Sequence, residues 1–186
     1  MDSGLLLVIL IAVPLVGGLV CWQSEFVNKN LPKWFALVTM LVVLGIGLYL
    51  WSAGNFDFTL LGPHHRWVTE FQVPWIPRLG ISFHLALDGL SLLLVLLTGL
   101  LGVMAVACSW REIFRKSGFF YMNLLWNFAG VIGVFLSVDL FLFFFFWEMM
   151  LVPMFFLIAL WGHDMPGQKR TYAAIKFFIF TQASGL

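Results

Sequence analysis

Glu148 is the residue of this sequence whose position most strongly indicates chemistry. It is the only ionisable residue of the apolar segment 140–161, and at 1.5 Å per residue it lies about 12 Å from the start of that segment. A carboxyl group so deep in a bilayer costs about 2.5 kcal/mol or more. We therefore expect the acid to face a protein or water interior and to act there. The alternative is a structural acid, hydrogen-bonded within a helix bundle.

Pro153 follows Glu148 by five residues in the same segment. A proline inside a helix removes one backbone donor and leaves the carbonyl four residues earlier, that of Met149, without its helical partner. A buried carboxyl group beside a free backbone carbonyl is the local chemistry expected of a proton or cation path.

Polar residues also interrupt the last apolar segment. Lys176 is a second candidate relay residue, and the alternative is that its amino group reaches up to the membrane surface. Counted from the helix ends, Lys176 is about 7 Å deep and Glu148 about 20 Å, so water or another side chain must lie between them if they communicate. Three more polar residues follow: Thr181, Gln182 and Ser184. They fit either hydrogen bonds between helices or a hydrated interior.

The composition is that of an integral membrane protein. Of 186 residues, 62% are hydrophobic and only 10% are charged, whereas soluble domains carry about 25% charged residues. The net charge of +1 gives no indication of a nucleic-acid partner. Two cysteines are too few for a disulfide framework or a metal site, and no phosphate loop, haem motif or iron–sulfur motif is present in the sequence. We expect no cofactor in this chain.

Six apolar runs have the length of membrane-spanning helices. They cover residues 4–22, 32–52, 89–109, 118–137, 139–161 and 171–186. The first begins without a basic region or a cleavage site, so we expect a retained span rather than a signal peptide. All six belong to one all-α membrane domain, 1–186. The sixth run ends with the chain, which we interpret as the N-terminal part of a longer protein.

The outer loop, 53–88, is the one sizeable stretch outside the predicted spans. Residues 56–60 and 81–85 alternate with a period of two, which predicts a β-hairpin lying on the membrane surface. Asp88 and Asp139 precede apolar runs, and each is a candidate helix N-cap. The loop histidines, His64, His65 and His84, have no second ligand at metal spacing, so surface hydrogen bonding is the favoured interpretation.

Lysine and arginine are distributed unevenly between the two sides. Seven lie in the loops of one side: Lys29, Lys33, Arg111, Arg115, Lys116, Lys169 and Arg170. Only Arg66 and Arg78 lie on the other. The positive-inside rule then places the first set in the cytoplasm, and the N-terminus and the 53–88 loop outside a bacterial inner membrane.

Two segments carry a family resemblance. Residues 75–91 read WIPRLGISFHLALDGLS, and residues 145–154 read FFWEMMLVPM. Together they closely resemble the antiporter-like membrane subunits of respiratory complex I, NADH-quinone oxidoreductase. The resemblance covers essentially the whole chain. It implies a fold of about fourteen helices containing two inverted repeats with broken helices.

The resemblance also implies a function. Glu148 would be a proton-relay acid that pairs with a lysine on a later helix, beyond this chain. The chain would be part of a proton-translocating subunit that couples electron transfer in other subunits to proton pumping. NADH, FMN, iron–sulfur clusters and quinone would be bound by those subunits. Its partners would be adjacent antiporter-like subunits and the lipid bilayer, with no nucleic acid.

Two alternatives stay open. The same fold serves cation/proton antiporters and membrane-bound hydrogenases, so the chain could belong to either. A non-catalytic structural membrane subunit, in which Glu148 only packs, is the second alternative. By itself, a chain that ends in the sixth span would be too short to translocate protons by the family mechanism.

Overall fold

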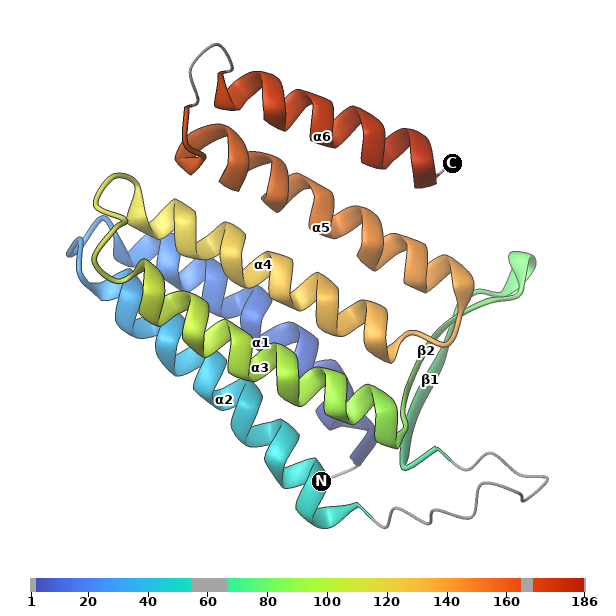
Figure 1. Ribbon diagram of the computed structural model, residues 1–186. Coiled ribbons are helices and arrows are strands. Elements are labelled where there is room, and N and C mark those ends of the chain that lie inside the picture. The colour runs from blue at the N-terminus through green and yellow to red at the C-terminus, as the bar shows by residue number, and fades with distance from the viewer. Residues whose placement is uncertain (1–2, 55–66, 165–168, 186) are drawn as a thin grey trace.

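The computed structural model describes residues 3–54, 67–164 and 169–185. Within these ranges the chain forms six helices and one two-stranded sheet (Figure 1). The helices are α1 (Ser3–Ser24), α2 (Leu31–Ala53), α3 (Gly89–Ser109), α4 (Ser117–Leu136), α5 (Leu140–Trp161) and α6 (Arg170–Gly185). Their bounds lie within about two residues of those expected from hydropathy, which is the usual uncertainty of a helix end.

Helices α1 to α5 are long and apolar enough to cross a membrane. A bilayer offers no water to the backbone, so a spanning segment must satisfy its own N–H and C=O groups, as a helix does. Helix α6 has 16 residues, which corresponds to about 24 Å and is shorter than a bilayer's hydrocarbon core of about 30 Å. The protein is thus a multi-pass membrane protein, and the crossing by α6 stays a prediction.

Helices α1 to α4 pack as a bundle, and α5 and α6 lie beside α4 in turn. Helix α4 packs against α1 and α5, α2 packs against α1 and α3, and α6 packs against α5 (Figure 1). A buried cluster joins the first five helices to the sheet and includes Leu7, Leu10, Leu85 and Leu136, each at most 1% exposed. Helix α5 therefore lies between α4 and α6.

The sheet is an antiparallel hairpin of β1 (Thr69–Ile76) and β2 (Ile81–Leu87), joined by the short 3₁₀ helix η1 (Pro77–Leu79) and Gly80. Gly80 has φ 69°, a left-handed conformation that glycine adopts without steric cost. The pairing runs from Thr69 opposite Leu87 to Ile76 opposite Ile81.

The expected strand 81–85 is confirmed as part of β2, but its expected partner is not the one observed. Residues 56–60 lie outside the described residues, and β2 pairs with 69–76 instead. Pro74 is accommodated because each strand of a two-stranded hairpin has a free edge, and the register shifts beside it. No spanning helix lies in the described part of the loop, 67–88.

The hairpin is attached to the turn between α4 and α5. The backbone N–H of Val138 donates to the carbonyl of His84 over 3.1 Å, and Leu85 forms an isolated bridge with Ser137. Asp139 caps α5 by accepting from the N–H of Phe141 at 2.8 Å. Asp88 caps α3 by accepting from the N–H of Ser91 at 2.7 Å. Both expected N-caps are confirmed.

The basic connections gather at the opposite end of the bundle from the hairpin (Figure 1). There the Lys33 ammonium donates to the carbonyl of Trp110 over 2.8 Å, and the Trp161 indole donates to the carbonyl of Arg115 over 3.2 Å. The connections α1–α2, α3–α4 and α5–α6 therefore share one side, as the charge distribution predicted. Arg66, His64 and His65 lie outside the described residues.

Candidate functional site

Glu148 lies near the middle of α5, on the side of the helix that faces α6. Its side chain is half-buried, and its Oε2 accepts a hydrogen bond of 2.7 Å from Nε2 of Gln182 on α6. Counted from the ends of the two helices that share the basic side, Glu148 is about 20 Å deep and Gln182 about 18 Å. The two side chains therefore meet at the same level, well inside the span.

The opposite face of α5 fixes this orientation. Phe146 and Met150 pack against Gly130 and Gly133 of α4, where the absence of a side chain lets the two helices approach closely. Phe146 and Glu148 stand about 160° apart around the helix, at 3.6 residues per turn. Because Phe146 faces α4, the carboxyl group of Glu148 faces α6.

Helix α6 presents a narrow stripe to α5. Phe178 lies edge-to-face with Phe155, with ring centroids 5.9 Å apart. Gln182 and Gly185 follow at i+4 and i+7 on the same face. A Cβ added at Gly185 would lie 3.5 Å from Oε1 of Glu148. Both carboxyl oxygens of Glu148 therefore lie against this stripe.

Lys176 is not brought to Glu148. It lies about 120° around α6 from Gln182, its side chain is exposed, and its ammonium lies 4.7 Å from the ring centroid of Tyr172. Among the described residues, the one contact between a basic side chain and a carboxyl group within ion-pair distance joins His84 to Glu70. The structure thus agrees with the expectation that Lys176 and Glu148 do not touch directly.

The other polar residues of α6 bond within their own helix. Thr181 donates to the carbonyl of Phe177 at 2.8 Å, and Ser184 donates to the carbonyl of Thr181 at 2.9 Å. Of these three polar side chains, Gln182 is the one that bonds to another helix. The sequence marked Gln182 as polar but did not identify it as the partner of Glu148, because the side of α6 that faces α5 is set by tertiary contacts such as that between Phe155 and Phe178.

His84 lies on β2 of the hairpin. Its Nε2 lies 2.7 Å from Oε1 of Glu70 on the neighbouring strand. No group of three or more potential metal ligands occurs in the described ranges. Pro153 is buried within α5, which continues through it to Trp161.

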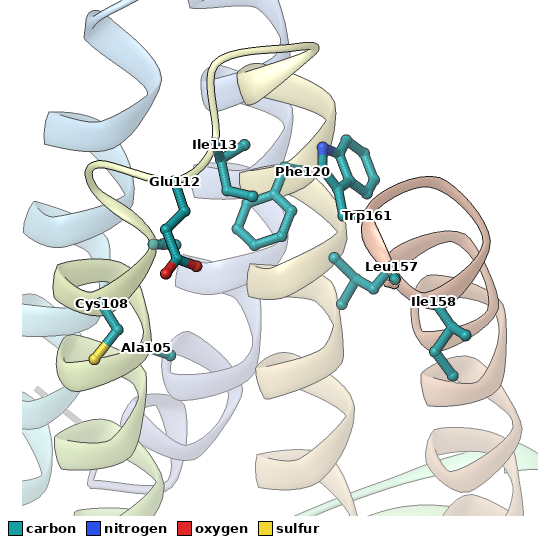
Figure 2. A pocket seen from close by; sticks show the side chains of 10 residues that line it. Ala105, Cys108, Glu112, Ile113, Phe120, Leu157, Ile158 and Trp161 are labelled. Atoms are coloured by element: carbon teal, nitrogen blue, oxygen red, sulfur yellow. The ribbon is translucent and has the colours of Figure 1, made fainter. Parts of the chain in front are cut away.

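A cavity of about 400 Å³ opens among α3, α4 and α5 near the basic end (Figure 2). In Figure 2, Cys108 and Glu112 lie on one side, and Leu157, Ile158 and Trp161 of α5 on the other. Its lining contains neither Glu148 nor Lys176. The cavity is therefore separate from the candidate site.

Comparison with known proteins identifies relatives over most of the chain. Residues 137–186, which hold Glu148 and Gln182, match the family model described as NADH:quinone oxidoreductase/Mrp antiporter, TM. The chain is 61% identical over 180 residues to NADH-quinone oxidoreductase subunit M of Pseudomonas aeruginosa. That alignment covers 95% of this chain and 35% of the relative, so the chain spans about a third of the length of the curated relatives that it matches.

Solved structures share the fold. A chain of respiratory complex I from Thermus thermophilus, solved with bound NADH, superposes with a TM-score of 0.73 at 25% identity, covering 97% of this chain and 33% of that one. A chain of the Mrp complex from Dietzia sp. gives a TM-score of 0.75 at 26% identity, covering 97% and 18%. The resemblance to the antiporter-like membrane subunits of complex I is therefore confirmed, and over nearly all its residues this chain is a homologue of subunit M of NADH-quinone oxidoreductase.

Proposed function

We propose that this chain is part of a proton-translocating membrane subunit of NADH-quinone oxidoreductase, respiratory complex I. The subunit couples electron transfer from NADH to quinone, carried out in other subunits, to proton movement across the membrane. The proposal is supported by the 61% identity to subunit M of Pseudomonas aeruginosa. In that assembly its partners are adjacent membrane subunits and lipid, while FMN, iron–sulfur clusters, NADH and quinone belong to the other subunits.

The observation that carries the proposal is the placement of Glu148. The acid lies deep in a spanning helix, it points away from the α4–α5 contact, and it has a polar partner on α6. A carboxyl group with this depth and a hydrogen-bond partner can be held either ionised or protonated, which a proton relay requires. Glu148 is thus assigned as the group that takes up and releases the proton.

Lys176 has a secondary place in the proposal. It stands nearer the basic end of α6 and on another face than Gln182, so a proton passing between Lys176 and Glu148 has to travel through water or through residues outside this chain. The basic end faces the cytoplasm of a bacterial cell, and the hairpin and the N-terminus lie on the other side of the inner membrane.

A second candidate function is cation/proton antiport. It is favoured by the match of the fold to the Mrp complex from Dietzia sp., with a TM-score of 0.75. Both functions need a proton-carrying acid at Glu148, and they differ in the driving reaction. Proton movement that depends on NADH oxidation supports the first, and proton movement driven by a sodium gradient alone supports the second.

Replacement of Glu148 in the intact complex tests the proposal. Glu148→Gln keeps the size and hydrogen bonding of the side chain but cannot carry a proton, so we expect NADH-driven proton pumping in membrane vesicles to fall at least tenfold. Glu148→Ala should lower proton pumping to a similar extent, and the complex should still assemble. Glu148→Asp keeps the acid with a shorter reach and should retain part of the rate.

The matched control is Glu112→Gln, which removes an exposed carboxyl group outside the spans. It should leave pumping and assembly unchanged. Pumping by Glu148→Gln at the rate of the unaltered complex would show that the acid is structural, and would refute the relay.

A further inference from the structure

We propose that Gln182 is a positioning residue for Glu148, and that its side-chain amide serves as a hydrogen-bond partner for both protonation states of the acid. The inference rests on the proposed relay function of Glu148 and adds to it a second residue. Gln182 itself carries no proton.

The contact that supports this is short and joins two different helices. Nε2 of Gln182 lies 2.7 Å from Oε2 of Glu148, although the residues are 34 positions apart in the chain. Both side chains are half-buried and lie at the same depth. On the same helix, a Cβ added at Gly185 would lie 3.5 Å from Oε1 of Glu148.

The chemistry of the amide fits an acid that changes charge. A primary amide has two N–H donors and one carbonyl acceptor, whereas lysine and arginine only donate. The ionised carboxylate accepts from Nε2–H of Gln182. When a proton adds to Oε2 of Glu148, a half-turn of the amide presents Oε1, which accepts from the new O–H. One hydrogen bond replaces another, and Gln182 stays neutral throughout.

The surrounding packing keeps the amide available for this exchange. The contact between Phe155 and Phe178 holds α6 against α5 one turn away from Gln182. Thr181 and Ser184 are satisfied by carbonyls of their own helix, so they do not compete for the carboxyl group. A buried polar group without a partner is costly in an apolar surrounding, and the exchange leaves the acid partnered in both states.

Gln182→Met is the main test, because methionine has a similar volume and neither donates nor accepts a strong hydrogen bond. Because the variant removes the hydrogen bond that Gln182 donates to the carboxyl group, we expect NADH-driven pumping in the intact complex to slow by about tenfold or more. Gln182→Asn keeps the amide on a side chain one methylene shorter, and its pumping rate should lie between those of the unaltered complex and Gln182→Met. Thr181→Val is the matched control on the same helix and should pump normally.

An infrared readout separates positioning from packing. The carboxyl C=O band that appears on acidification and is missing in Glu148→Gln belongs to Glu148. In Gln182→Met this band should move to a different wavenumber, because the protonated acid has lost its acceptor. Should Gln182→Met fail to assemble, the same band is measured in Gln182→Asn, where the weaker contact should also displace it.

The outcomes distinguish this inference from the function on which it rests. Normal pumping by Glu148→Gln refutes the relay itself. Loss of pumping in Glu148→Gln together with normal pumping by Gln182→Met, or with an unmoved carboxyl band in both Gln182 variants, refutes the role of Gln182 and leaves the relay standing.

Discussion

At the scale of single residues, the candidate site is the hydrogen bond of 2.7 Å between Glu148 of α5 and Gln182 of α6. Glu148 stands out because nothing else in 140–161 is ionisable. Gln182 could not be paired with it in advance, because the face that α6 turns toward α5 depends on Phe155, Phe178 and the glycines of α4, all of them tertiary contacts. The two aspartate caps were predictable, since capping depends on local sequence alone.

Asp139 offers a test of whether a second acid near α5 is structural. Its carboxylate accepts from the N–H groups of Phe141 and Leu142, at 2.8 and 3.3 Å. Asp139→Ala should lower the stability of the subunit by about 1 kcal/mol, whereas Asp139→Asn should be nearly neutral because asparagine caps equally well. Thermal unfolding of the purified complex measures both. Loss of pumping in Asp139→Asn with unchanged stability would instead make Asp139 a proton carrier.

At the scale of elements, spans were easier to predict than strands. Twenty apolar residues in a row specify a helix in a bilayer, with little dependence on neighbours. The hairpin was only half predicted, because β1 contains Pro74, a residue that argues against a central strand. Its pairing with β2 is stabilised by contacts with the α4–α5 turn, which no local pattern in the loop reveals.

The close approach of α4 and α5 yields a stability prediction. A Cβ at Gly133 would enter the contact distance of the Phe146 ring, whereas a Cβ at Gly45 of α2 would meet nothing within 4 Å. Gly133→Ala should therefore destabilise the subunit by about 1–3 kcal/mol, and Gly45→Ala should be neutral or slightly stabilising. Thermal unfolding of the two variants compares them directly. Equal melting temperatures would mean that α4 and α5 do not pack through Gly133.

At the scale of the whole molecule, the charge distribution predicted which connections lie together. The structure groups the α1–α2, α3–α4 and α5–α6 connections at one end and the hairpin at the other (Figure 1). That the basic end faces the cytoplasm is a proposal, which rests on the positive-inside rule. The chain spans about a third of the length of the curated relatives that it matches, and no pattern in these residues specifies the remainder.

Labelling tests the orientation. Single cysteines placed at Arg115 and at Arg78, both exposed, should react with a membrane-impermeant reagent from opposite faces of sealed vesicles. Cys108 is exposed and is first replaced by serine, while Cys21 is buried and should not react. Inverted vesicles should label at position 115 and right-side-out vesicles at position 78. Reaction of both positions from the same face would overturn the arrangement.

The position of Pro153 has a mechanical consequence. Helix α5 is continuous from its N-cap, Asp139, to Glu148. Its start is attached to the hairpin through the bridge between Leu85 and Ser137, and this part of the helix packs against α4. The missing backbone bond at Pro153 lies beyond the acid, and helices bend most readily at such a point. A bend of α5 at Pro153 would move the Trp161 end relative to residues 139–148, and it would have to break the hydrogen bond between the Trp161 indole and the carbonyl of Arg115. In such a bend the carboxyl group of Glu148 would keep its position relative to α4 and the hairpin, because it precedes Pro153 in the helix.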